Sequence, residues 1–262
     1  MTLTFSQSHV LVNKAIKPKN PVLIVGLPGI GFVSKLAADH LVKSSGAEHF
    51  ATLYSPNLPN QVVAMKSGSL RPFCMRFYYK KFKSRDVVIL KGDMQPLTVE
   101  GQYEVTAKIL RFFQQLGGHE VIAMAGYALN KQNDKPNVFC AATSKEYMHQ
   151  FLELGAKQND AIVPIVGMAG LVPAMARLYK MKGTCLLVET PGQNIDATGA
   201  GTLVELLARM LHEKIDVSPL RGQARKAEEV MRRIEAQAKQ EEGRAVAMPE
   251  AGARRETLSY IH

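Results

Sequence analysis

Short apolar runs alternate with segments of helical periodicity along most of this chain, and several of the runs end in a loop that contains glycine. Short, continuous apolar runs are typical of strands buried on both faces, whereas apolar residues at helical spacing indicate amphipathic helices. Strands that alternate with helices favour βαβ units and parallel pairing. The sequence therefore predicts an α/β fold, with a mostly parallel sheet flanked by helices.

The expected elements follow one another closely. Strands are expected at residues 21–25, 61–66, 73–79, 87–90, 121–125, 138–142, 161–166 and 184–188, with a short edge strand at 10–12. Helices are expected after the first glycine turn and at 103–116, 169–179 and 196–214, the last capped by Asp196. The turn Ser67-Gly68-Ser69 predicts that 61–66 and 73–79 form a hairpin or an edge pair.

Charge and cysteine content narrow the functional classes. The 33 basic and 23 acidic residues give a formal net charge of +10, which permits a nucleic-acid or acidic protein partner without requiring one. Cys74, Cys140 and Cys185 lie far apart in apolar surroundings, which excludes a Cys-x-x-Cys metal site and predicts buried free thiols. No apolar run approaches the ~20 residues of a membrane span. We expect a cytoplasmic protein.

The C-terminal part of the sequence differs in character from the rest. Residues 219–241 are highly charged, with Val230, Met231 and Ile234 on a narrow apolar stripe that predicts an amphipathic helix for packing on a partner copy or on its own domain. Residues 242–262 have no periodicity, so a flexible tail is expected. The predicted organisation is an α/β domain at 1–218, this helix, and the tail.

Glycine loops after the strands form the first candidate site. The turn Gly26-Leu27-Pro28-Gly29-Ile30-Gly31 resembles a phosphate-binding turn, although Pro28 stands where the dinucleotide fingerprint needs its second glycine, and no P-loop lysine follows. In a parallel sheet such loops gather at one edge, where open α/β proteins bind ligands. Gly26, Gly29, Gly31, Asp93 and Glu189 are the candidates for a small-molecule site or for an enzyme of the hydrolase or phosphorylase type. Close helix–strand packing explains the glycines equally well, and a turn or backbone hydrogen bonds explain the carboxylates.

A second candidate is the segment from Arg71 to Arg85, where basic residues are interleaved with aromatic ones. This composition suits single-stranded nucleic acid. The alternative is a strand with one apolar face, followed by a Lys-rich turn that protects a sheet edge.

Several motifs occur in a fixed order that is more specific than any one of them. They are residues 22–31 with Ala37-Ala38 in the next helix; Lys91-Gly92-Asp93-Met94-Gln95-Pro96 before Gly101-Gln102-Tyr103; Ala125-Gly126-Tyr127; residues 167–171; and Leu186-Leu187-Val188-Glu189-Thr190-Pro191-Gly192 before Asp196. In this order they resemble the archaeal branch of the proteasome assembly chaperone family, over roughly residues 15–220. The resemblance implies a nucleoside-phosphorylase-like α/β fold, a homo-oligomer and no established enzyme activity. We expect no cofactor and no metal.

The resemblance also implies a partner. Members of this family bind proteasome α-subunits or another protein assembly, and a C-terminal tripeptide of hydrophobic residue, tyrosine and any residue can enter pockets between those subunits. Here the sequence ends Leu258-Ser259-Tyr260-Ile261-His262, so its tyrosine is third from last. Leu258, Tyr260, Ile261 and His262 are the expected partner-binding residues. A non-catalytic, protein-binding assembly factor is the leading hypothesis; a small-molecule enzyme and a nucleic-acid binder are the alternatives.

Overall fold

A computed structural model describes residues 5–129, 133–158 and 164–222 of the chain, all within one compact unit, Met1–Ala224. In these residues the main sheet has nine strands in the order β1-β3-β6-β7-β2-β8-β11-β9-β10. The strands are β1 (His9–Val12), β2 (Val22–Gly26), β3 (Glu48–Tyr54), β6 (Met75–Lys81), β7 (Asp86–Gly92), β8 (Glu120–Ala128), β9 (Val138–Ala142), β10 (Lys157–Gln158) and β11 (Lys182–Thr190).

Parallel pairing is confined mainly to the centre of the sheet. Strands β7, β2, β8 and β11 are parallel neighbours. On one side β6, β3 and β1 follow in antiparallel order, and on the other β9 is antiparallel to β11 and parallel to β10. The central strand β2, Val-Leu-Ile-Val-Gly, is buried throughout, as its continuous apolar sequence predicts. The predicted α/β fold is confirmed, as a mixed sheet with a parallel centre.

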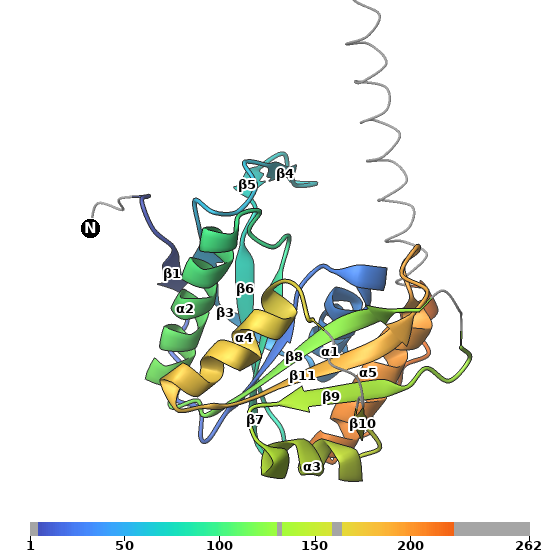
Figure 1. Cartoon of the computed structure of the whole chain (residues 1–262). Coiled ribbons are helices and arrows are strands. Elements are labelled where there is room, and N and C mark those ends of the chain that lie inside the picture. The colour runs from blue at the N-terminus through green and yellow to red at the C-terminus, as the bar shows by residue number, and fades with distance from the viewer. Residues whose placement is uncertain (1–4, 130–132, 159–163, 223–262) are drawn as a thin grey trace, which may run out of the picture. The chain divides into compact units, whose positions relative to one another are not determined.

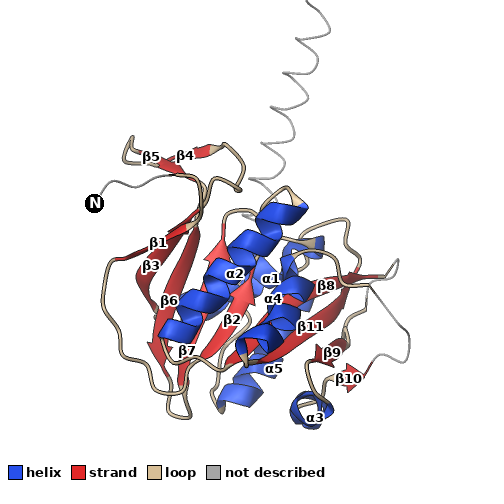
Figure 2. Ribbon diagram, turned by 60° about the vertical axis from the view of Figure 1, so that its left-hand side comes forward, coloured by secondary structure: helices blue, strands red, loops and turns tan. Residues whose placement is uncertain are grey.

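Helices cover both faces of the sheet (Figures 1 and 2). Helices α1 (Val33–Ser45), α3 (Lys145–Glu153) and α5 (Ala197–Leu211) pack on the face that includes Val22 and Ile24, whereas α2 (Val99–Gln115) and α4 (Met168–Ala176) pack on the face that includes Leu23 and Val25. Alternate residues of one strand therefore serve two separate cores, because successive strand side chains point to opposite faces. Two short 3₁₀ turns, η1 (Ile30–Phe32) and η2 (Arg177–Tyr179), complete the fold.

Helix starts follow the capping signals in the sequence. Asp196 accepts hydrogen bonds from the backbone nitrogens of Thr198 and Gly199 at the start of α5, which confirms its predicted role. Thr98 and Ser144 cap α2 and α3 in the same way. These side chains bond backbone N–H groups that have no partner within the helix.

The predicted hairpin forms over a shorter span than expected. Strands β4 (Val62–Ala64) and β5 (Leu70–Pro72) pair with each other in a separate two-stranded sheet. The expected strand at 73–79 is instead β6, which lies inside the main sheet between β3 and β7. Its predicted pairing with 61–66 is therefore wrong for β6, and a hydrogen bond of 3.1 Å from the backbone nitrogen of Phe73 to the carbonyl oxygen of Gln61 is what remains of it. The reason is burial. Met75 and Phe77 alternate with more exposed residues and are buried in the core under α2, whereas a hairpin that projects from the domain would leave them exposed.

Other expectations differ in detail. The strand β3 and the helix α3 were not predicted, and both are present. Part of the strand expected at 161–166 lies outside the described residues, and the remainder, 164–166, is irregular. Of the amphipathic helix expected at 219–241, the structure describes only residues 219–222. Its stripe residues Val230, Met231 and Ile234, and the tail residues Leu258, Tyr260, Ile261 and His262, lie outside the described residues, so the domain boundaries stay predictions. No helix within the described part of the chain is both long and apolar enough to span a bilayer.

Candidate functional site

The glycine loops meet at the carboxyl edge of the parallel strands, as predicted. A Cβ atom on Gly26 would lie 2.2 Å from Cβ of Ala38 and 2.6 Å from the carbonyl oxygen of Ser34, so only glycine lets α1 approach β2 this closely. Gly31 has a φ of +61°, and a Cβ there would lie 2.5 Å from Oγ1 of Thr190. These contacts support the packing interpretation of both glycines.

Gln95 joins two loops at this edge. Its Nε2 donates a hydrogen bond of 2.6 Å to the carbonyl oxygen of Pro28, and its Oε1 accepts one of 3.0 Å from the backbone nitrogen of Met168. The first bond holds the turn after β2, and the second satisfies an N–H at the start of α4. One side chain therefore fixes the turn and the helix on opposite sides of the site.

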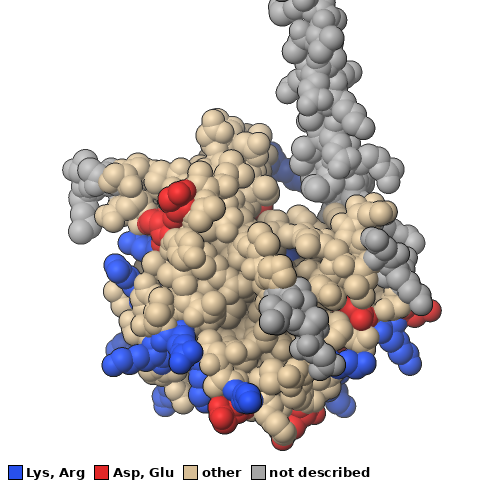
Figure 3. Space-filling model, viewed as in Figure 1, with Lys and Arg blue, Asp and Glu red and all other residues tan. Residues whose placement is uncertain are grey.

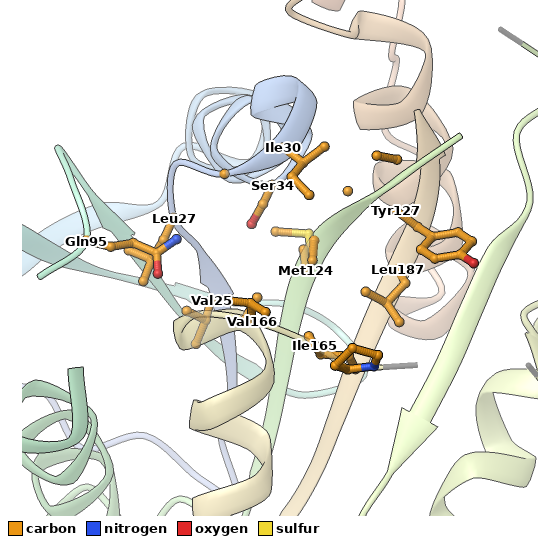
Figure 4. Close-up of a pocket in the computed structure, with 16 residues that line it drawn as sticks. Val25, Leu27, Ile30, Ser34, Gln95, Met124, Tyr127, Ile165, Val166 and Leu187 are labelled. Carbon is orange, nitrogen blue, oxygen red and sulfur yellow. The ribbon is translucent and has the colours of Figure 1, made fainter. Parts of the chain in front are cut away.

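An apolar pocket with a volume of about 320 Å³ lies between these loops (Figure 4). Its walls include side chains from the ends of β2, β8 and β11, together with η1 and the segment before α4; the labelled ones include Val25, Leu27, Ile30, Met124, Ile165 and Leu187. Gly29 lines it, whereas Gly26 and Gly31 do not. The sequence located this edge through its glycines but did not indicate that its lining is largely apolar.

Ser34, in the first turn of α1, is one of the few polar residues that line the pocket, with Gln95 and Tyr127. Its side chain lines the pocket and is only 3% exposed, and its Oγ has no hydrogen-bond partner among the described residues. A helical serine commonly donates to the carbonyl three or four residues earlier. Here the carbonyl of Gly31 accepts from the backbone nitrogen of Asp196 instead.

The two candidate carboxylates do not converge. Asp93 follows β7 and Glu189 lies in β11, with β2 and β8 between them, so about 14 Å of sheet separates the two strands. Neither residue lines the pocket. The acid–base pair considered from the sequence is therefore absent as a geometric unit from the described part of the chain.

Asp93 belongs to an ionic cluster. It accepts hydrogen bonds of 2.5 Å from Arg71 and 2.9 Å from Arg76, and one of 3.0 Å from the backbone nitrogen of Cys74. Burial alone would raise the pKa of Asp93, but the Arg71 hydrogen bond and the Arg76 charge outweigh it and hold that pKa below its ordinary value. The cluster fastens β5 and β6 to the end of β7.

Glu189 has a comparable structural setting. Its side chain accepts hydrogen bonds from the amide of Asn133 and from both the side chain and the backbone nitrogen of Asn137. Burial acts to raise the pKa of Glu189, and the Asn137 hydrogen bonds more than offset this, so the pKa is lowered. The predicted role in satisfying backbone N–H groups is present for Asn137.

The basic–aromatic segment is used largely inside the fold. Arg71 and Arg76 bind Asp93, and Arg85 forms an ion pair of 2.7 Å with Glu120. Phe77 is buried against Phe112, with 4.9 Å between the ring centroids. These contacts favour the strand interpretation of Arg71 to Arg85, although β6 is an interior strand and does not protect an edge.

The three cysteines are free and buried, as predicted. Burial raises the pKa of each thiol, to about 12 for Cys185. Among the residues placed by the structure, no three His, Cys, Asp or Glu side chains gather as a metal site requires.

The sequence profile of the PAC2 family matches residues 23–235, which is most of the chain. This chain belongs to the PAC2 family. Its curated relatives include the Methanocaldococcus jannaschii protein MJ1210, which is 32% identical over 222 residues that cover 84% of this chain and 86% of that protein.

Solved structures of PAC2 relatives share the fold. Pyrococcus furiosus PbaB, described as an archaeal proteasome activator, is 33% identical, covers 87% of this chain and 99% of its own, and has a TM-score of 0.78. Pyrococcus furiosus PbaA, described as an archaeal homolog of proteasome-assembly chaperone, is 26% identical over 90% of this chain and 99% of its own, with a TM-score of 0.74. The resemblance inferred from the ordered motifs is thus confirmed for this PAC2 chain.

The sequence did not predict the unpartnered hydroxyl of Ser34 or the bridging hydrogen bonds of Gln95. The motif that contains Gln95 does not indicate its hydrogen bonds, because its partners lie 67 and 73 residues away along the chain. Ser34 has the appearance of an ordinary residue in the first turn of a helix. The glycines at the strand ends and the ordered motifs both indicate that these loops lie together, but neither signal identifies the hydrogen bonds of Gln95.

Proposed function

We propose that this chain is a non-catalytic protein-binding factor that binds proteasome α-subunits and promotes their assembly or the activity of the assembled particle. The observation that carries this proposal is the likeness to PbaB, at 33% identity over 99% of that chain. The name of PbaB favours activation, and the name of PbaA favours assembly. Both activities require a surface that recognises another protein.

An exposed apolar edge supports a protein partner. Val62 and Leu70 on the β4–β5 hairpin, and Leu97 and Val99 at the start of α2, are each more than half exposed. The Arg71–Asp93 ion pair links the hairpin to the loop that precedes α2. Most of the Lys and Arg side chains visible on the viewed face lie below the hairpin, although some lie beside it (Figure 3). Grouped apolar side chains on a surface mark interaction sites more often than isolated ones do.

The carboxylates also favour binding over acid–base chemistry. Asp93 is held by two arginines and Glu189 by two asparagines, so each has a structural task within the fold. Among the described residues that line the apolar pocket, Tyr127 is the only one with a titratable side chain.

Capture of purified α-subunits tests the proposal and locates the contact. Four immobilised proteins are compared: the full chain, the chain stopped at Gln240, the Leu97→Glu variant and the Leu178→Glu variant. Leu178 is a matched control because it is 77% exposed against 73% for Leu97, and it lies at the far end of α4 in η2. We expect the full chain and Leu178→Glu to capture α-subunits, and Leu97→Glu to capture about tenfold less, because a charge within an apolar contact loses its hydration without gaining a partner.

The truncated chain decides the role of the tail. Loss of capture on stopping at Gln240 would assign the contact to Leu258, Tyr260, Ile261 and His262, as the resemblance implies. Retained capture would assign it to the folded unit. Failure of the full chain to capture α-subunits would overturn the proposal.

Assembly and activation are separated by two further assays. An assembly factor accelerates formation of α-subunit rings from separate subunits, whereas an activator raises peptide hydrolysis by mature particles without altering ring formation. The expected homo-oligomer, and the packing of Val230, Met231 and Ile234 between copies, remain part of the proposal. Light scattering of the full chain and of the chain stopped at 218 tests both.

A further inference from the structure

The pocket at the carboxyl edge occupies the place where β2 would continue. Strand β2 pairs with β8 only as far as Val25 and Ala123, whereas β11 pairs with β8 as far as Thr190 and Ala128. Beyond Ala123, β8 therefore has no strand neighbour on the β2 side among the residues that the structure describes. Residues 124–128 of β8 line the pocket at this gap. The gap lies at the edge of the sheet where open α/β folds place their ligands.

The walls of this gap suit an apolar molecule of modest size. Val25, Leu27, Met124 and Leu187 are among its apolar lining residues. A cavity of about 150 Å³ accepts benzene, and the pocket here, at about 320 Å³, is about twice that size. Its lining contains no Lys, Arg, Asp or Glu among the described residues. A charged ligand would lose hydration without gaining a counter-charge, so the chemistry favours a neutral one.

Ser34 adds a specific polar requirement. Its hydroxyl points from the first turn of α1 toward the pocket (Figure 4). Ser34 has an exposed fraction of only 3%, and its Oγ has no hydrogen-bond partner among the described residues. A buried hydroxyl without a partner is costly, and folded proteins rarely keep one. The same hydroxyl is satisfied if a bound molecule brings its own hydrogen-bonding group to this wall.

We propose that this pocket is a binding site for a small neutral molecule with an apolar body and one hydroxyl-type hydrogen-bonding group. The body lies among Val25, Leu27, Met124 and Leu187, and the polar group bonds Oγ of Ser34. Gln95 positions the two sides of the site by holding Pro28 and Met168.

The test uses two probes of matched shape, p-cresol and toluene, which differ by one hydroxyl. Each is titrated into the full-length chain, and dissociation constants are read from backbone amide shifts, which also locate the site. Probes this small are expected to bind in the millimolar range. We expect shifts centred on Ser34 and residues 124–128, and an affinity about three- to tenfold higher for p-cresol, which corresponds to one net hydrogen bond.

Three variants make the assignment specific. Ser34→Ala should bind both probes with nearly equal affinity, because the difference arises from the hydroxyl. Ser44→Ala, on the same helix at an exposed position, should retain the preference for p-cresol. Ala169→Leu places a larger side chain on the pocket wall and should remove binding of both probes.

Each remaining outcome counts against the site. Equal affinities for the two probes in the unmodified chain, or a preference that survives Ser34→Ala, would overturn the role of Ser34. Shifts centred elsewhere, or no saturable shift with either probe, would overturn the pocket itself. Because the titration contains no proteasome subunit, its result is independent of the proposed function.

Discussion

The side-chain amide of Gln95 lies 2.6 Å from the carbonyl oxygen of Pro28, to which it donates a hydrogen bond. The other end of the same amide accepts a hydrogen bond from the backbone of Met168. The turn after β2 and the start of α4 are thus connected through a residue that follows β7. Three separate parts of the chain that bear family motifs are held in one arrangement by this contact.

Gln95→Ala should destabilise the fold by about 1–3 kcal/mol, because it leaves the half-buried carbonyl of Pro28 and the helix N–H of Met168 without these partners. The measurement is the urea midpoint of unfolding. Gln115→Ala, at an exposed position in the last turn of α2, is the control and should change the midpoint little. Equal midpoints for the two variants would show that Gln95 does not hold the edge together.

The ionic cluster at Asp93 predicts a pH-dependent loss of stability. The pKa of Asp93 is lowered in the folded chain, so the stabilisation is present above the pKa of the unfolded residue, about 4, and is lost as pH falls through the folded value. Asp93→Asn should cost about 1–3 kcal/mol at neutral pH. The cost should shrink in acid, where the original carboxyl is protonated as well.

Urea unfolding of the Asp93→Asn variant at several pH values checks this dependence. Glu48→Gln is the control, since the Lys14–Glu48 ion pair is exposed on both sides. Exposed pairs contribute little to stability. A difference between Asp93→Asn and the original chain that stays constant from neutral pH into acid would contradict the pKa assignment.

Close packing of α1 on β2 predicts that Gly26→Ala is strongly destabilising. The new methyl group would overlap Ala38 and the carbonyl of Ser34, neither of which has room to move within a packed helix. Overpacking of this kind costs about 1–3 kcal/mol or more. Gly222→Ala meets nothing within 4 Å and should be nearly neutral. Thermal unfolding of both variants, followed by circular dichroism, makes the comparison.

The unpartnered hydroxyl of Ser34 predicts a stabilising substitution. Ser34→Ala removes a buried group that has no bond in the unliganded chain, and should raise the free energy of unfolding by about 1 kcal/mol or more. Ser44→Ala, at an exposed position, corrects for the higher helix propensity of alanine. If Ser34→Ala gains no more stability than Ser44→Ala, the hydroxyl already has a partner, such as an ordered water.

Local sequence patterns accounted for the central strands and most helices. The run Val22–Gly26 predicts a buried strand because it is apolar without interruption, and Asp196 predicts a helix start because its side chain caps the next turn. The strand Glu48–Tyr54 escaped prediction because it begins with polar residues directly after a helix. The position of β6 between β3 and β7 was not predicted either, because the order of strands depends on burial across the whole sheet and not on the local sequence.

The candidate site was predicted in location more than in chemistry. Glycines at the strand ends indicated the edge where Gly26, Gly31 and Gly126 allow close contacts. Asp93 and Glu189 were candidates because they are carboxylates at strand ends, yet Asp93 accepts a hydrogen bond from Arg71 and Glu189 accepts one from Asn137. Whether a polar side chain has a partner depends on distant residues, so no local pattern separates Asp93, which is satisfied, from Ser34, which is not.

Equilibrium binding of the full-length chain to proteasome α-subunits of its own organism tests the central claim most directly. Biolayer interferometry over a concentration series gives the dissociation constant, with Leu178→Glu as the matched control for Leu97→Glu. We expect saturable binding with a dissociation constant in the micromolar range or tighter, which corresponds to about −8 kcal/mol or more favourable. Absence of saturable binding at concentrations up to about 1 mM, where only about −4 kcal/mol is needed, would contradict the account.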